Sequence, residues 1–313
     1  MIGRASAWLT DTKHSLYGVS VTRMIVGFVV ATQVLVNAPD RSYTWGDGSE
    51  WTSSVPGAER YPVFFGLFGS LDGWWFDLAY LATMLSGVVM MLGYRARLAT
   101  FVTLVLWVSL SVTNPFVVSG GDAVLRMVLF YLLFTESGRY WSVDSWLRRR
   151  GREVRPLTPP WFSAALHNLA VILLIHQVVM VYVGSALWKV QSPVWRDGTA
   201  VYYPLQTDAY SPWVDVLHPV YASGPVIAGA TYTAMVVQLL FPLLLTYRPT
   251  RLAALVLITG MHLAIGLLMG ILYFSLAMIS VDMMLVSDTS WRRFAAWARG
   301  RTSRVRAGSA PQP

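Results

Sequence analysis

A lysine at the end of a long apolar run is the residue best suited to acid–base chemistry. Lys189 closes the segment Tyr182-Val-Gly-Ser-Ala-Leu-Trp-Lys189, and Trp195-Arg-Asp-Gly198 follows a few residues later. A lysine at the end of a membrane helix often extends its ammonium group to the interface. An enclosed lysine instead loses its charge readily and can serve as a base at neutral pH. Both interpretations stay open. In the second, Trp188 and Trp195 are candidates to shield Lys189 from water, and Trp195 and Asp197 are candidates to line a substrate or quinol pocket beside it.

Two histidines fall near the middle of apolar runs. They are His176 and His262. A single histidine in a membrane helix usually forms a hydrogen bond with a neighbouring helix. Two at matching depth could bind a quinone oxygen or pass protons, provided that they face each other. The sequence leaves both roles open.

Asp122 and Arg126 are four residues apart at the start of a short apolar run, directly after Gly120-Gly121. This spacing places both on one face of a helix. Asp122 can cap the helix and pair with Arg126. The alternative is that the two side chains form a polar patch in an outer cavity, next to a substrate or quinol.

Arg23 and Asp282 are expected at similar depths near the inner ends of the first and last apolar runs. A charge at membrane depth is costly, so an ion pair between them is plausible. The simpler alternative is that Arg23 extends to the inner interface on its own.

The elements that must position these residues are membrane helices. Hydrophobic residues make up 55% of the 313 residues and charged residues only 13%, whereas soluble domains carry about 25% charged residues. There is no cysteine, which excludes disulfides and thiolate metal sites, and no other metal-ligand spacing occurs. The net charge of +8 lies in short stretches between apolar runs, which indicates membrane topology and not nucleic-acid binding.

The apolar runs predict an all-α membrane bundle of about eight transmembrane helices without a soluble domain. The run Leu252–Val286 would be about 52 Å long as one helix, so we expect it to break near Gly266 and Gly270 into two helices. The other expected helices are Tyr17–Val36, Trp74–Leu92, Leu98–Val118, Ala123–Phe134, Trp161–Trp188 and Ser223–Thr246.

Positive charge predicts which ends face the cytoplasm. With eight helices and the N-terminus inside, inner segments carry eighteen Arg and Lys residues, and outer loops carry only Arg41, Arg60 and Arg196. The positive-inside rule therefore favours a multi-pass protein of the cell membrane with both termini in the cytoplasm. The expected organisation is a cytoplasmic N-terminus (1–16), a transmembrane domain (17–287) and a basic, partly disordered cytoplasmic tail (288–313).

Three motifs together resemble the HTTM family, which is related to the membrane domain of vitamin K-dependent gamma-carboxylase. They are Tyr140-Trp-Ser-Val-Asp144, the segment from Tyr182 through Lys189 to Gly198, and His262 followed by Phe274-Ser275. The resemblance covers roughly residues 15–290. The resemblance implies that Lys189 matches the carboxylase lysine that deprotonates reduced vitamin K. In the carboxylase, the deprotonated vitamin K then reacts with oxygen and forms a strong base, which drives carboxylation. This chain has Ser119-Gly-Gly-Asp122 where the carboxylase has a histidine-containing stretch.

Two functions follow as hypotheses. The first is a quinol-linked, oxidase-like or carboxylase-like enzyme with its site on the outer face, using a reduced naphthoquinone such as a menaquinol. The second is a non-catalytic accessory membrane protein that aids maturation, export or immunity of a secreted peptide. An enzyme should enclose Lys189 in a cavity open to lipid, whereas an accessory protein can leave it exposed.

Overall fold

The structure, a computed structural model, describes residues 2–46, 66–151, 158–208 and 211–308, and these residues contain helices and no strand. The prediction of an all-α bundle is confirmed. The longer helices are α2 (Leu16–Val36), α4 (Gly73–Leu92), α5 (Ala96–Thr113), α6 (Gly120–Leu132), α8 (Pro160–Gln191), α12 (Gly224–Leu244), α13 (Arg248–Leu268), α14 (Leu272–Asp282) and α15 (Asp288–Gly308). The short ones are α1 (Ile2–Thr10), α3 (Arg41–Trp45), η4 (Leu67–Ser70), η5 (Pro115–Val117), α7 (Val143–Arg149), α9 (Pro193–Arg196), α10 (Tyr202–Leu205), α11 (Val214–Tyr221) and η6 (Met283–Leu285).

Six helices of the described chain are long and apolar enough to cross a membrane: α2, α4, α5, α8, α12 and α13. The other two predicted spans are shorter. With 13 and 11 residues, α6 and α14 would be about 20 Å and 16 Å long, less than the roughly 30 Å of a hydrocarbon core. They pack against each other and against α2 inside the bundle, so a count of eight complete crossings stays a prediction.

The predicted break in the run 252–286 lies between α13 and α14. Gly270 in this turn has φ +69°, a left-handed conformation that glycine adopts without a steric penalty. Gly266 remains inside α13, where a Cβ atom would lie 2.9 Å from the Cβ of Ser275. Gly270 therefore permits the turn, and Gly266 allows α14 to fold back closely against α13.

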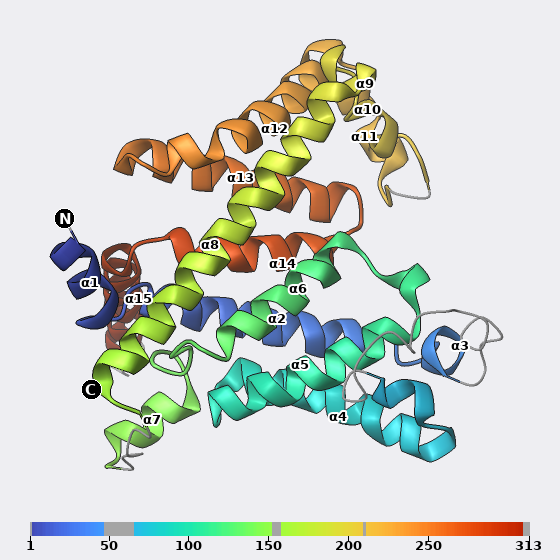
Figure 1. The fold of residues 1–313 in the computed structure, drawn as a ribbon. Helices are drawn as coiled ribbons and strands as arrows, with labels where there is room; N and C mark the ends of the chain where they lie inside the picture. Colours follow the sequence, from blue (N-terminus) through green and yellow to red (C-terminus); the bar gives the residue numbers. More distant parts are fainter. Residues whose placement is uncertain (1, 47–65, 152–157, 209–210, 309–313) are drawn as a thin grey trace.

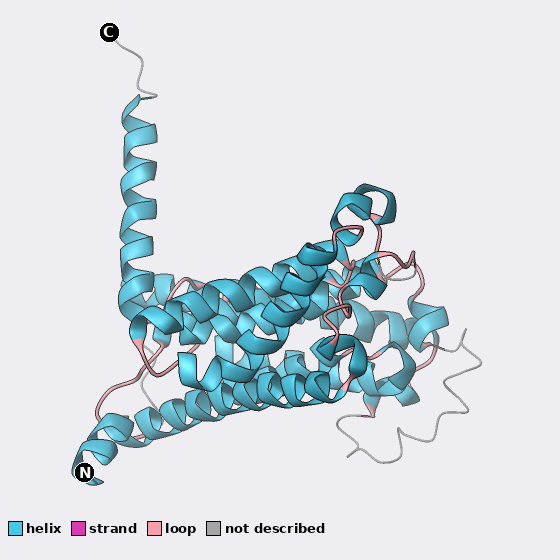
Figure 2. Cartoon of the chain, turned by 90° about the horizontal axis from the view of Figure 1, so that it is seen from above, coloured by secondary structure: helices cyan, strands magenta, loops and turns pink. Residues whose placement is uncertain are grey.

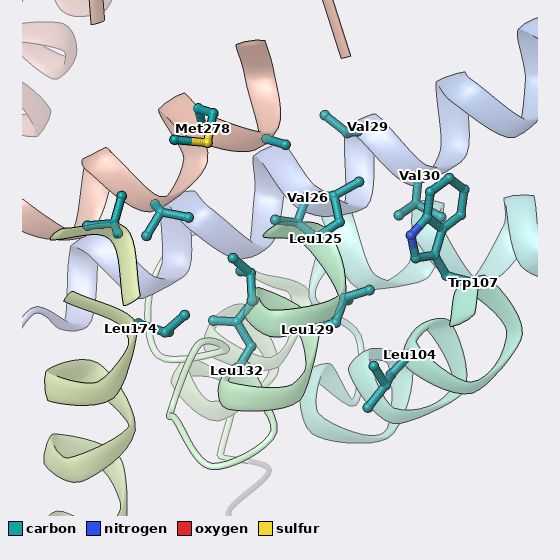
Figure 3. Packing of buried hydrophobic residues seen from close by; sticks show 14 of the residues in the cluster. Val26, Val29, Val30, Leu104, Trp107, Leu125, Leu129, Leu132, Leu174 and Met278 are labelled. Carbon is teal, nitrogen blue, oxygen red and sulfur yellow. The ribbon is translucent and has the colours of Figure 1, made fainter. Parts of the chain in front are cut away.

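Helix α2 lies at the centre of the larger core (Figure 3). Val26, Val29 and Val30 meet Leu125 and Leu129 of α6 in a cluster that continues to Leu174 of α8, Trp107 of α5 and Met278 of α14. The contact of α2 with α4 is a backbone contact, since a Cβ on Gly27 would lie 2.7 Å from the carbonyl oxygen of Gly87. Small residues at such crossings let membrane helices pack tightly without a hydrophobic driving force.

Both ends of the chain lie at one end of the bundle (Figure 1). There α1 and α15 lie near the start of α8, while α9, α10 and α11 gather around the other end of α8. Figure 2 shows α15 projecting at a steep angle to the long helices. The predicted tail is thus helical through Gly308. The partial disorder expected in this tail is not tested for residues 309–313, which lie outside the described residues.

An ion pair fixes the N-terminal segment on this side. The ammonium of Lys13 pairs with Glu136 in the loop after α6 and donates to the Ser163 hydroxyl at 2.7 Å. Burial raises the pKa of Glu136, but the Lys13 ammonium, with smaller contributions from Arg139 and His167, outweighs burial and holds this pKa below its ordinary value. The pair therefore holds the segment before α2 against the start of α8.

Arg23 of α2 is fully buried and donates its hydrogen bonds to backbone carbonyls. Nη1 donates to Met90 and Met91 in the last turn of α4, Nε to Ser137 at 3.0 Å, and Nη2 to Trp141 at 2.8 Å. The last carbonyls of a helix have no partner within that helix and carry partial negative charge. Arg23 thus caps the C-terminal end of α4 and holds the loop before α7 against α2.

We expect Arg23→Gln to lower the free energy of unfolding by about 3 kcal/mol or more, because several carbonyls would lose a buried partner. Arg23→Lys should recover part of this loss, since one ammonium cannot reach all four carbonyls. Thermal unfolding in detergent, followed by tryptophan fluorescence, measures both variants.

The matched control is Arg97→Gln, an arginine exposed on α5, which should change stability by less than about 0.5 kcal/mol. Equal losses at positions 23 and 97 would show that the carbonyl contacts of Arg23 do not stabilise the fold.

Topology reporters fused after Pro313 and before Met1 should both report the cytoplasm, and a reporter inserted in the 206–213 loop should report the outside. The reason is that α1 and α15 lie at the arginine-rich end of the bundle and α9 to α11 at the other end. Reporters on the two termini that disagree would require an odd number of crossings and remove the eight-span interpretation.

Candidate functional site

A cavity of about 670 Å³ lies between α12 and α13 and is covered by α9, α10 and the end of α8. Its walls are almost entirely apolar, with side chains such as Ile227, Ala234 and Ile265. Trp195 and Phe274 contribute aromatic rings, and Thr233 contributes a hydroxyl. Among its described lining residues, Lys189 is the only one with an ionisable side chain.

The ammonium of Lys189 is held by two contacts. It donates to Oε1 of Gln238 on α12, and it lies 4.7 Å from the ring centre of Trp195 on α9. In the described part of the chain no carboxylate pairs with it. The structure thus places Lys189 half-buried at the wall of the cavity and not extended into the interface.

Only one of the two predicted tryptophan shields covers this lysine. Trp195 lies over the ammonium, whereas Trp188 is 76% exposed. Adjacent residues of a helix point about 100° apart, so Trp188 and Lys189 cannot share a face. Asp197 is exposed beyond α9 and does not line the cavity.

A buried polar cluster lies deeper in the bundle. The hydroxyl of Tyr182 is 2.8 Å from Oδ2 of Asp282 and 3.2 Å from Nε2 of His262. All three side chains are at most 2% exposed. Tyr182 precedes Lys189 by two turns on the same face of α8, about 10 Å along the axis. The cluster therefore lies below the lysine, towards the middle of the bundle.

The cluster adjoins the cavity through shared neighbours. Met261, next to His262 in the chain, lines the cavity and accepts a 3.9 Å contact from the amide of Gln238. Phe274, also in the wall, lies 5.9 Å from the His262 ring centre. Nδ1 of His262 is buried without a partner among the described residues. The positions of the wall residues Met261 and Phe274 are thus tied to the buried cluster.

The predicted ion pair between Arg23 and Asp282 is wrong. Arg23 donates to four backbone carbonyls, and Asp282 accepts from Tyr182. Equal depth in the membrane does not set the direction in which a side chain points around its helix. The donors of Arg23 are occupied by carbonyls at the end of α4, from Met90 and Met91, and by those of Ser137 and Trp141 in the loop before α7.

The two predicted histidines do not come together. His262 is buried in the cluster, whereas His176 is exposed on α8. His176 precedes Tyr182 by six residues, which turns it about 240° away from the tyrosine that contacts His262. This arrangement does not support quinone binding or proton transfer by the two histidines together.

Asp122 caps its own helix and does not pair with Arg126. Its carboxylate accepts from the backbone N–H of Ser119 at 2.6 Å and from the amide of Gln33 at 3.2 Å. Nε of Arg126 is buried without a partner in the described chain. Neither residue lines the cavity, although Gly121 beside them packs against the backbone of Phe274.

Gln238 and the grouping of Tyr182 with His262 and Asp282 are site features that the sequence analysis missed. Gln238 is the one amide side chain within the apolar run of α12. Because buried polar groups in membranes need partners, this position alone could have indicated a functional or structural contact. In the described residues, no group of three or more His, Asp or Glu side chains could hold a metal ion.

The fold and this site define a multi-pass membrane protein with an apolar cavity near one end of its bundle. The sequence profile of the HTTM domain matches residues 13–291, nearly the whole chain. The chain therefore belongs to the HTTM family, a family of membrane domains associated with carboxylase-like proteins. No solved structure matches the chain.

We expect Tyr182→Phe to lower the free energy of unfolding by about 2 kcal/mol, because it leaves Asp282 and Nε2 of His262 buried without a partner. His176→Ala, on the same helix but exposed, should stay within about 0.5 kcal/mol of the unchanged protein. Thermal unfolding in one detergent compares the two. Equal effects would argue against a structural role for the cluster.

Proposed function

We propose that this protein is a quinol-linked membrane enzyme, with its site in the cavity beside Lys189 and with Lys189 as the base. The observation that carries the proposal is a single lysine at the wall of an otherwise apolar cavity of about 670 Å³. Pockets for small molecules are typically apolar, of roughly 300–1,000 Å³, with a few polar groups that fix orientation.

The residues present fit a reduced naphthoquinone. Trp195 and Phe274 offer ring faces to a planar bicyclic ring, and Leu257 and Ala264 of α13 supply apolar wall for an isoprenoid tail. Leu257 is 46% exposed on the side of the bundle, so the cavity borders a surface that contacts lipid. A hydrophobic molecule could enter from the bilayer without crossing water.

Within this cavity Lys189 would take up the proton of a quinol hydroxyl. To act as a base Lys189 must be the neutral amine, whose Nζ could donate one hydrogen bond to Gln238 and keep its lone pair for the quinol proton. A general base must come within about 2.6–3.2 Å of the proton donor, and the contacts with Gln238 and Trp195 would hold Nζ at the cavity wall for such an approach. A bound reduced naphthoquinone would itself supply the hydroxyl group that is deprotonated and the electrons for the reduction of oxygen.

The buried cluster would position this site. His262 of the cluster contacts Phe274, and Gln238, which holds Lys189, contacts Met261. Both Phe274 and Met261 line the cavity, so the cluster and Lys189 contact the same wall. Precise placement of reacting groups is worth several kcal/mol in catalysis. In this proposal His262 acts through the wall, while Asp122, Arg126, His176 and Asp197 take no part in the chemistry.

Lys189→Arg and Lys189→Ala should both abolish oxygen uptake driven by reduced menaquinone-4, because arginine keeps the charge but cannot act as a base at neutral pH. Both should still retain the naphthoquinone, detected by mass spectrometry of extracts from the purified protein. Ala234→Trp should fill the cavity and remove the naphthoquinone while Lys189 stays in place.

Leu169→Trp, an exposed position of α8, is the matched control for added aromatic bulk and should keep both uptake and naphthoquinone. Wild-type uptake in Lys189→Arg would make the lysine an interfacial anchor. That result, or naphthoquinone content that does not respond to Ala234→Trp, would favour the accessory function in maturation, export or immunity of a secreted peptide.

A further inference from the structure

A second hollow lies at the opposite end of α13. This groove, which we call the inner groove, has a volume of about 760 Å³ and runs between α13, η6 and the start of α15. It opens at the end of the bundle where α1 and α15 lie, the end that carries most of the arginines. Its place differs from that of the cavity beside Lys189, although Val256 and Gly260 of α13 border both.

The rim of the inner groove is positively charged. Arg248 and Arg251 come from the first turn of α13, and Arg293 comes from α15. In the described chain none of these three side chains forms an ion pair or hydrogen bond. No acidic side chain lines the groove, since the nearby Asp288 accepts from the backbone N–H groups of Leu16 and Tyr17. The rim therefore presents three uncompensated cations.

The rim also offers hydroxyl groups, and the floor is apolar. Ser287, Thr289 and Ser290 border the groove at the start of α15. Below them Leu252, Val256 and Leu263 follow α13 at helical spacing and form an apolar trough along its length. These three side chains are 44–65% exposed. Charge and hydrogen-bond donors at one end of an apolar trough match a ligand with an anionic head and hydrocarbon chains.

The orientation of α15 fits a position of this rim at the membrane interface. The chain bends by 105° between the segment Leu272–Leu285 and α15, so α15 runs roughly across the bundle (Figure 2). Phe294 and Trp297 are 53% and 55% exposed, three residues apart on one face. An amphipathic helix with exposed aromatic residues and arginines commonly lies in the plane of the membrane interface.

We propose that the inner groove binds an anionic phospholipid of the leaflet on the side of the termini. The phosphate would lie among Arg248, Arg251 and Arg293, and one acyl chain would lie in the trough of α13. Basic pockets between membrane helices recognise anionic headgroups in this way. The site would fix α15 against α13 through the lipid.

Native mass spectrometry tests this proposal on the full chain released from detergent. The unchanged protein should bind one phosphatidylglycerol at least about tenfold more tightly than phosphatidylcholine with the same chains. The variant Arg248→Gln/Arg251→Gln/Arg293→Gln should lose this preference. Thr259→Trp narrows the trough, keeps all charges, and should weaken phosphatidylglycerol binding as well.

The control variant Arg4→Gln/Arg97→Gln/Arg149→Gln removes the same charge from exposed arginines outside the groove and should keep the preference. Lipid-free thermal unfolding should be alike in both triple variants, because neither removes a described side-chain contact. Equal loss of preference in both would mean general charge attraction and overturn the proposal. Glycerol phosphate that competes as well as the lipid would mean an anion site without a lipid, and it would also overturn it.

Discussion

Backbone groups at helix ends that have no partner within their helix are the constraint on which this structure depends. Where such groups are buried in the bilayer or in the protein they have no access to water, so another part of the protein must satisfy them. Arg23 does this for the end of α4 and for the loop that follows α6. Asp144 accepts from the backbone N–H groups of Arg95 and Ala96 at the start of α5, each at 2.8 Å. Asp288 does the same for the start of α2.

From these contacts we expect Arg23, Asp144 and Asp288 to be costly to remove, although none of the three forms an ion pair in the described chain. Each joins elements that are far apart in the sequence: Arg23 to α4, Asp144 to α5, and Asp288 to α2. The motif Tyr140-Trp-Ser-Val-Asp144, which carries part of the family resemblance, thereby has a structural meaning. Its aspartate caps α5, and the carbonyl of its tryptophan accepts a hydrogen bond from Arg23.

Helix positions and the break at Gly270 could be predicted from sequence, because apolar run length and glycine act locally. Membership in the HTTM family could likewise be predicted, and it is confirmed over residues 13–291. Which side chains meet could not be predicted in the same way. Arg23 and Asp282 share a depth but not a direction, and the same holds for His176 and His262. Rotation about each helix axis is set by packing across the whole bundle, which hydropathy does not encode. Run length does show that α6 is short, but it does not show where the run 252–286 divides, which leaves α14 with 11 residues.

The length of α8 has a consequence for where the lysine lies. Its 32 residues span about 48 Å, well beyond a hydrocarbon core of about 30 Å, and Figure 1 shows it slanting across the other helices. A helix longer than the bilayer adjusts by tilting or by extending from the surface. Lys189 lies in its last turn, so its depth depends on how far this end of α8 extends from the hydrocarbon core. A thicker or thinner membrane would therefore change, together with the tilt of α8, the distance between that amine and the aqueous boundary.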